Sequence, residues 1–220
     1  MISPTTEELE FIRACRINTQ EERFLEQCSI YGDFLYETNE TMNLTRIPPE
    51  EFWTKHICDS LSLAMRWEMP RDGHHVKMCD VGCGAGLPSL ILAAALPDLE
   101  IVPVDSTGKK IEFVRHAASE MGLSHVHAVH ARANELARKA PWRGSFRYVS
   151  ARAVAAAPLL KKETFGLLRQ GGCLAIYRTM SQAGPELPEL RKAGCRVRAT
   201  EEFLLPGESG GRMFLLIEKG

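Results

Sequence analysis

Three glycines at alternate positions follow an acidic residue in the run Asp80-Val81-Gly82-Cys83-Gly84-Ala85-Gly86. Glycine adopts the backbone conformations of a tight turn and lets a ligand approach bare main chain. The apolar run that comes next predicts a helix, whose first unpaired N–H groups would point at that ligand. The pattern therefore predicts a nucleotide-like cofactor at a strand–turn–helix junction.

The residues around the turn favour one class of cofactor. The dinucleotide fingerprint is G-x-G-x-x-G with an acid about 20 residues further on, and here Leu87 stands where its third glycine belongs. Asp80 would repel a pyrophosphate, whereas it suits a ligand that carries an ammonium and a sulfonium group. Asp105 falls where an acid binds ribose hydroxyls. We therefore predict S-adenosylmethionine, in a pattern that resembles the first motif of class I methyltransferases.

Strands and helices alternate from residue 76 to the C-terminus, and repeated βα units predict an α/β fold. We expect a doubly wound, mostly parallel, Rossmann-like sheet with helices on both faces. Strands are expected at 76–81, 101–104, 126–129, 146–150 and 173–177, helices at 88–96, 109–121, 134–139, 157–168 and 186–192, and a final antiparallel pair at 197–203 and 213–218. Pro103 conflicts with a central strand, which predicts a bulge or an early end to the pairing.

The N-terminal third shows helical patterns without intervening strands. Apolar residues recur at helical spacing over 7–17 and 21–36, and Pro48-Pro49 open a third helix. We therefore expect one methyltransferase domain over 1–220, with an N-terminal helical cap at 1–70 and a cofactor-binding core at 71–220.

Composition narrows the cellular setting. A net charge of -1 argues against broad adhesion to naked nucleic acid, and no apolar run reaches the ~18 residues of a membrane span. The seven cysteines include no Cys-x-x-Cys pair, so neither disulfides nor a metal site are expected. We expect a cytoplasmic monomer.

Motifs along most of the chain resemble the RsmG (GidB) family. They are Asn43-Leu44-Thr45, His56-Ile57-Cys58-Asp59-Ser60-Leu61, the glycine turn through Pro88, Asp105-Ser106-Thr107-Gly108-Lys109-Lys110 and Ala151-Arg152-Ala153. The resemblance implies methylation of guanine N7 in the 16S RNA of the small ribosomal subunit, with that RNA or the assembled subunit as partner.

The resemblance also implies site residues. The cofactor-binding positions are Asp80, Gly82, Gly84, Gly86, Leu87, Asp105, Ser106, Ala133, Asn134 and Arg152. The positions that hold the substrate are Arg152, Arg212, His56 and Asp59. The sequence departs from the family pattern at Ser89, Asn134, Tyr177-Arg178-Thr179 and Thr38.

The predicted chemistry needs no general base, because guanine N7 carries a free lone pair at neutral pH. Catalysis then consists of positioning, and the guanine must be unstacked to reach the site. Simpler interpretations remain open: Arg212 as a surface strand charge, and His56 as a packing histidine. Two other functions also remain open, a methyltransferase for small molecules and a non-catalytic assembly factor that binds S-adenosylmethionine. Basic clusters at Arg13-Arg16-Arg23, Lys109-Lys110-Arg115 and Arg191-Lys192-Arg196-Arg198 either follow RNA phosphates or are solvated faces.

Overall fold

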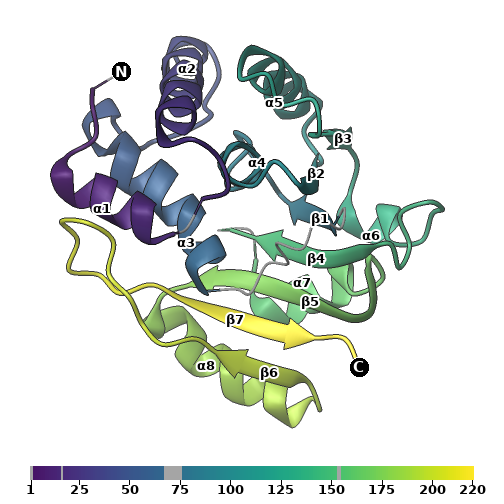
Figure 1. The fold of residues 1–220 in the computed structure, drawn as a ribbon. Helices are drawn as coiled ribbons and strands as arrows, with labels where there is room; N and C mark the ends of the chain where they lie inside the picture. The colour runs from purple at the N-terminus through teal and green to yellow at the C-terminus, as the bar shows by residue number, and fades with distance from the viewer. Residues whose placement is uncertain (1, 16, 67–75, 153–154) are drawn as a thin grey trace.

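A seven-stranded sheet in the order β3-β2-β1-β4-β5-β7-β6 runs through the molecule (Figure 1). The computed structural model describes residues 2–15, 17–66, 76–152 and 155–220. The strands are β1 (Val76–Val81), β2 (Leu99–Asp105), β3 (Val129–His130), β4 (Phe146–Ala151), β5 (Leu168–Arg178), β6 (Arg196–Ala199) and β7 (Met213–Glu218). β1 to β5 pair in parallel, and β7 is antiparallel to both of its neighbours. The predicted doubly wound, mostly parallel sheet is confirmed.

Helices cover both faces of this sheet, and two apolar clusters result. The core helices are α4 (Ser89–Ala95), α5 (Gly108–Glu120), α6 (Ala133–Leu136), α7 (Ala157–Thr164) and α8 (Met180–Lys192). Residues of α4 and α5 share a buried cluster with one side of the strands, whereas residues of α6, α7 and α8 share a second cluster with the other side. Successive strand residues such as Met78 and Cys79 belong to opposite clusters, as the period of two requires.

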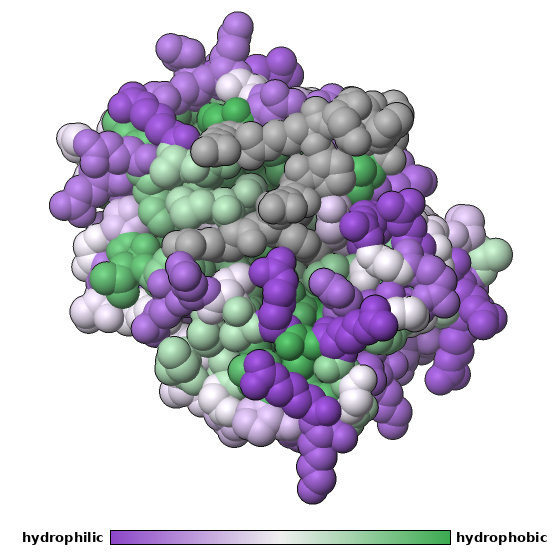
Figure 2. Space-filling model, turned by 60° about the horizontal axis from the view of Figure 1, so that its bottom comes forward, coloured by the Kyte–Doolittle hydropathy of each residue, from purple (hydrophilic) through white to green (hydrophobic). Residues whose placement is uncertain are grey.

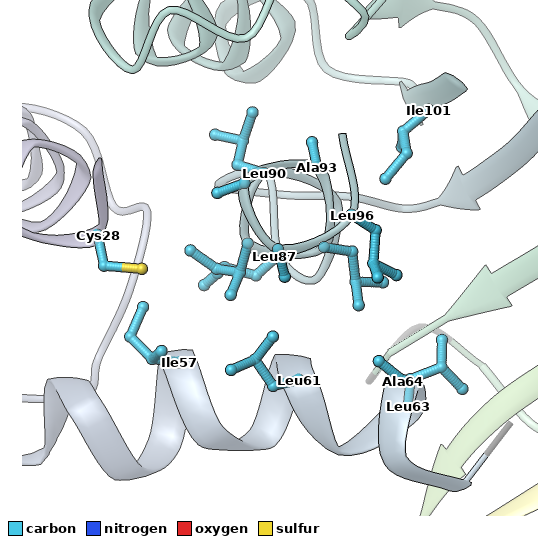
Figure 3. Packing of buried hydrophobic residues seen from close by; sticks show 14 of the residues in the cluster. Cys28, Ile57, Leu61, Leu63, Ala64, Leu87, Leu90, Ala93, Leu96 and Ile101 are labelled. Carbon is cyan, nitrogen blue, oxygen red and sulfur yellow. The ribbon is translucent and has the colours of Figure 1, made fainter. Parts of the chain in front are cut away.

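The N-terminal helices belong to the same cluster as α4 and α5. They are α1 (Thr6–Ala14), α2 (Glu21–Asn39) and α3 (Asp59–Arg66). Figure 3 shows Ile57 and Leu61 pointing toward Leu87 and the α4 helix, with Cys28 of α2 beside them. The N-terminal segment is therefore packed onto the core next to the glycine turn. The predicted boundary between residues 70 and 71 lies outside the described residues.

The segment before α3 is not the uniform helix that was predicted from Pro48 onward. It begins as a 3-10 turn (η1, Pro49–Glu51), continues as a π-helix (η2, Trp53–Cys58) and becomes α-helical at Asp59. Apolar spacing cannot distinguish these forms, because all three bury one stripe of residues. π-helical turns are rare and occur often at functional sites.

The prediction for residues 157–177 was wrong at one junction. α7 ends at Thr164 rather than at 168, and β5 begins at Leu168. Gly171 and Gly172, which lie between the predicted helix and the predicted strand, are inside β5 where the pairing with β4 shifts register. A Cβ at Gly172 would lie 2.9 Å from the carbonyl oxygen of Arg169, so these glycines serve an irregular strand.

Pro103 does not interrupt the pairing of β2 with β1, since Asp80 pairs with Pro103 without a shift. The backbone groups of Ile101 and Asp105 bond instead to the segment 125–131 on the other side of β2. Pro103 faces the same side, because alternate residues of a strand do. Regular pairing is broken there between the bridge at Ile101 and the start of β3, so the missing N–H falls in the gap. The expected irregularity exists, but on the β3 side.

Candidate active site

The glycine turn leaves the carboxyl end of β1, and its three glycines adopt positive φ angles of 70°, 57° and 83° at Gly82, Gly84 and Gly86. Their surroundings differ. A Cβ at Gly86 would lie 2.6 Å from Leu90 Cδ1, so this glycine allows α4 to pack closely. A Cβ at Gly84 would meet nothing nearer than the Gly82 carbonyl oxygen at 4.0 Å. Gly84 thus presents bare backbone to open space, as a ligand-binding turn requires.

Two side chains hold the turn in place. Asp105, at the end of β2, accepts hydrogen bonds from the Gly84 N–H at 3.1 Å and from the Thr107 N–H at 2.8 Å. Tyr31 of α2 donates its hydroxyl hydrogen bond to the Ala85 carbonyl at 2.8 Å. The sequence indicated Asp105 but gave no signal for Tyr31, beyond the rule that a buried tyrosine hydroxyl finds a partner.

Asp80 lies under the turn and is 1% exposed. Its carboxylate accepts hydrogen bonds from the hydroxyls of Ser150, at 2.7 Å, and of Ser89. Burial raises the pKa of Asp80 to about 6, against the opposing effect of these hydroxyls and of Arg152. Ser89, a departure from the family pattern, is therefore a direct partner of Asp80. Ser150, which is paired with Asp80 in the β1–β4 register, was missed from the sequence.

A cavity of about 390 Å³ opens at the carboxyl ends of β1, β2 and β3. Its lining consists of Val81, Gly82, Val104, Asp105, Ser106, Thr107, Lys110, Ala131, Arg132, Ala133, Asn134 and Glu163. Five predicted cofactor residues lie together in this lining: Gly82, Asp105, Ser106, Ala133 and Asn134. Asp80, Gly84, Gly86, Leu87 and Arg152 are not part of it. The side-chain oxygen of Asn134 is buried and has no hydrogen-bond partner within the described part of the chain.

Three of the four predicted substrate residues, Asp59, Arg152 and Arg212, lie together next to the carboxyl end of β4. Arg152 follows the last residue of β4, and its Nη1 donates to Asp59 Oδ2 at 2.8 Å. Arg212 Nε lies 3.6 Å from Asp59 Oδ1. The side chains of Asp59, Arg152 and Arg212 are 14%, 18% and 27% exposed, so the cluster is partly open to a ligand. Arg212 is thus part of an ion-pair cluster rather than an isolated strand charge.

The comparison with known proteins is direct. A family model described as rRNA small subunit methyltransferase G matches residues 24–206. The chain belongs to this family. The ribosomal RNA small subunit methyltransferase G of Geobacillus kaustophilus is 40% identical over 202 residues, which cover 90% of this chain and 83% of that protein. The family resemblance predicted from the motifs is confirmed.

Solved structures show the fold of this family member. A protein from Corynebacterium glutamicum matches with a TM-score of 0.57 and 16% identity, over 87% of this chain and 90% of that one. A SAM-dependent methyltransferase from Aquifex aeolicus matches with a TM-score of 0.53 and 14% identity, over 67% and 84%. At such identities the likeness concerns the Rossmann-like methyltransferase architecture alone.

Further ion pairs of this rRNA small subunit methyltransferase G family member adjoin the Asp59 cluster. Arg212 Nη2 lies 2.9 Å from Glu208 Oε2, and Lys55 Nζ lies 3.7 Å from Glu208 and 2.8 Å from Glu51. The Lys55–Glu208 pair joins the β6–β7 loop to the π-helix, where Thr54 also donates to the Pro206 carbonyl at 3.5 Å. The contact between Lys55 and Glu208 was not predicted, because the two residues come from segments far apart in sequence.

His56, the fourth predicted substrate residue, is 3% exposed. Its Nε2 lies 2.9 Å from Thr45 Oγ1, and its ring packs edge-on against Phe52 with centroids 6.0 Å apart. Burial, with a smaller contribution from Arg152, lowers the pKa of His56 to about 3. The imidazole is therefore neutral at physiological pH. Both a packing role and a role next to the substrate agree with this environment, so the substrate role stays a prediction.

The described part of the chain offers no metal site, and several of its other histidines and basic residues have partners of their own. No group of three metal-ligating side chains occurs within residues 2–15, 17–66, 76–152 and 155–220. The ring nitrogens of His125 and His130 lie within hydrogen-bond distance of backbone carbonyls. Arg13 pairs with Glu21, whereas Arg16 of the same basic cluster is not among the described residues.

None of the described helices has the length and apolarity for a membrane crossing. The face of the molecule in Figure 2 mixes hydrophilic and hydrophobic side chains.

Proposed function

We propose that the protein transfers the methyl group of S-adenosylmethionine to N7 of a guanine in 16S ribosomal RNA of the small subunit. The family match over residues 24–206 supports ribosomal RNA as the substrate class. The observation that carries the proposal is the arrangement of the glycine turn and Arg152, both within the matched residues. An open glycine turn at the end of β1 lies next to Arg152, which follows the paired strand β4.

The residues at the turn and in the cavity fit the cofactor. Asp105 uses its two oxygens for the Gly84 and Thr107 N–H groups and keeps lone pairs for ribose hydroxyls. The Asn134 oxygen, which is buried and has no partner among the described residues, is an acceptor suited to the amino group of an adenine. When bound, the cofactor supplies a methyl group made electrophilic by a positively charged sulfur.

The protein's own task is to bind and orient the guanine. N7 needs no deprotonation, and His56 and Asp80, two of the buried titratable groups nearby, agree with a mechanism that lacks a base. The pKa of His56 is lowered to about 3, which makes its imidazole a weak base, and the Asp80 carboxylate is occupied by two serine hydroxyls. Arg152 and Arg212 provide donors for guanine O6 or for phosphates of an unstacked nucleotide. Orientation of this kind is worth up to several powers of ten in rate.

Transfer of a radiolabelled methyl group tests the proposal. Purified protein is incubated with labelled S-adenosylmethionine and either naked 16S RNA or assembled small subunits, and the nucleosides are then separated by chromatography and identified by mass spectrometry. We expect label in 7-methylguanosine with at least one of the two substrates. No transfer to either substrate would refute the proposal and favour a non-catalytic assembly factor. Transfer to small molecules without RNA would favour the other alternative.

A further inference from the structure

Asp59 is a carboxylate held between two guanidinium groups in the cluster assigned to the substrate. Oδ2 lies 2.8 Å from Arg152 Nη1, and Oδ1 lies 3.6 Å from Arg212 Nε. A carboxylate offers about four lone-pair sites, and these two contacts leave two of them. The side chain is 14% exposed, so a ligand that enters the cluster has access to it.

Asp59 lies on the side of the site that we assign to the substrate. Asp59 begins α3, and the next residue, Ser60, accepts a hydrogen bond at its carbonyl from the Tyr177 hydroxyl at 3.0 Å. Tyr177 lies near the end of β5, and Arg152 follows β4. Asp59 is therefore fixed against the carboxyl ends of β4 and β5, next to the β1 strand that carries the glycine turn. Ligands of doubly wound sheets bind at these strand ends.

The charge of Asp59 decides between two kinds of ligand group. A carboxylate repels a phosphate, so a site for RNA backbone alone is better without it. A guanine base presents two adjacent donors, N1–H and N2–H₂, on its Watson–Crick edge, and a carboxylate matches them with its two oxygens. Adenine has an acceptor at N1 and is repelled. The neighbouring guanidinium groups are donors for O6, and this arrangement leaves N7, on the other edge of the purine, free.

We propose that Asp59 selects guanine by accepting hydrogen bonds from its N1–H and N2–H₂ groups. The inference rests on the proposed function and adds to it the residue that distinguishes guanine from other purines. If Asp59 were only a counter-ion for Arg152 and Arg212, the reaction would not depend on the guanine 2-amino group. That difference can be measured.

The test uses inosine, which is guanosine without the 2-amino group. Two 16S RNAs are ligated from fragments, one with guanosine and one with inosine at the nucleotide where mass spectrometry locates the methyl group. We expect wild-type kcat/KM to be about 10- to 100-fold higher for the guanosine RNA, because a site built to hydrogen-bond a donor rejects the analogue that lacks it. In Asp59→Asn the ratio should fall to within about threefold, since the amide loses one acceptor.

Glu208→Gln is the matched control. It removes a carboxylate that pairs with Arg212 but not with Arg152, and the ratio should stay at the wild-type value. Equal wild-type kcat/KM for the two RNAs, or an unchanged ratio in Asp59→Asn, would overturn the inference. If Asp59→Asn has no turnover, filter binding of the two RNAs decides: equal binding supports the inference, and a retained preference for guanosine overturns it. A wild-type protein that fails to methylate the guanosine RNA refutes the proposed function instead.

Discussion

The hydroxyl of Tyr31 connects the N-terminal helices to the glycine turn, and its removal is the sharpest single perturbation of that connection. Tyr31→Phe keeps the ring, which is fully buried and lies 6.2 Å from Phe52 and 6.5 Å from Phe113 between centroids. It removes only the donor to the Ala85 carbonyl, which lies 2.8 Å away. The variant therefore tests a hydrogen bond and leaves the packing unchanged.

The expected cost is set by the buried carbonyl that loses its partner. An unsatisfied buried acceptor costs about 1–3 kcal/mol of unfolding free energy, and each kcal/mol lowers Tm by about 2–4 °C in a protein of this size. The turn at Gly84 and Gly86 relaxes in the variant and must be re-formed when the cofactor binds. We therefore expect Kd for S-adenosylmethionine to rise by about 5- to 30-fold, equivalent to about 1–2 kcal/mol. Thermal unfolding and calorimetric titration measure the two quantities.

Tyr36→Phe is the control for this experiment. The Tyr36 hydroxyl also donates to backbone carbonyls, those of Ile47 and Pro48 at 3.1 and 3.2 Å, but it does not contact the glycine turn. The control should lower stability slightly and leave Kd within about twofold of the wild-type value. If Tyr31→Phe also leaves Kd unchanged, the N-terminal helices do not support the turn and the reasoning fails.

Three further predictions concern the site. Asp80→Ala should abolish cofactor binding in calorimetry, and unchanged affinity would contradict the cofactor assignment. Arg152→Ala should reduce turnover by about a hundredfold or more because orientation is lost, with Kd for the cofactor near the wild-type value; surviving turnover would remove Arg152 from substrate positioning. The third prediction uses pH: the folded pKa of His56, about 3, is depressed from 6.5, so the stability linked to this group is present above pH 6.5 and is lost as the pH falls toward 3. Between pH 7 and 5 the wild-type protein should lose about 2 kcal/mol more than His56→Gln in urea unfolding, and equal losses would show that His56 is not buried and neutral.

The glycine turn and its strand could be predicted from the sequence because their signals are local. The apolar run of β1, the acid and the spaced glycines lie within a dozen residues, and the predicted strand at 76–81 matches Val76–Val81. The cavity at the strand ends could also be predicted, since Asp105 ends β2, Asn134 comes shortly after β3, and parallel strands end at one edge of the sheet.

The contacts that join these local pieces were not predictable in the same way. Asp59 and Arg152 were each selected, but nothing in a single sequence shows that residues 93 positions apart form an ion pair. The π-helix at Trp53–Cys58 escaped prediction because its apolar stripe resembles that of an α-helix. The helix predicted over 157–168 was too long, because tertiary pairing with β4 begins β5 at Leu168.

The long-range contacts of the N-terminal helices have a consequence for synthesis of the chain on the ribosome. Ser60 accepts its hydrogen bond from Tyr177, 117 residues later, and Thr54 donates to Pro206, 152 residues later. At about 5–20 residues per second, the first of these partners is translated roughly 6–23 s after Ser60. During that interval the apolar side chains of α2 and η2 have no complete core to cover them. The helices made first are thus completed last, and the nascent chain is most open to aggregation or chaperone binding at its N-terminal end.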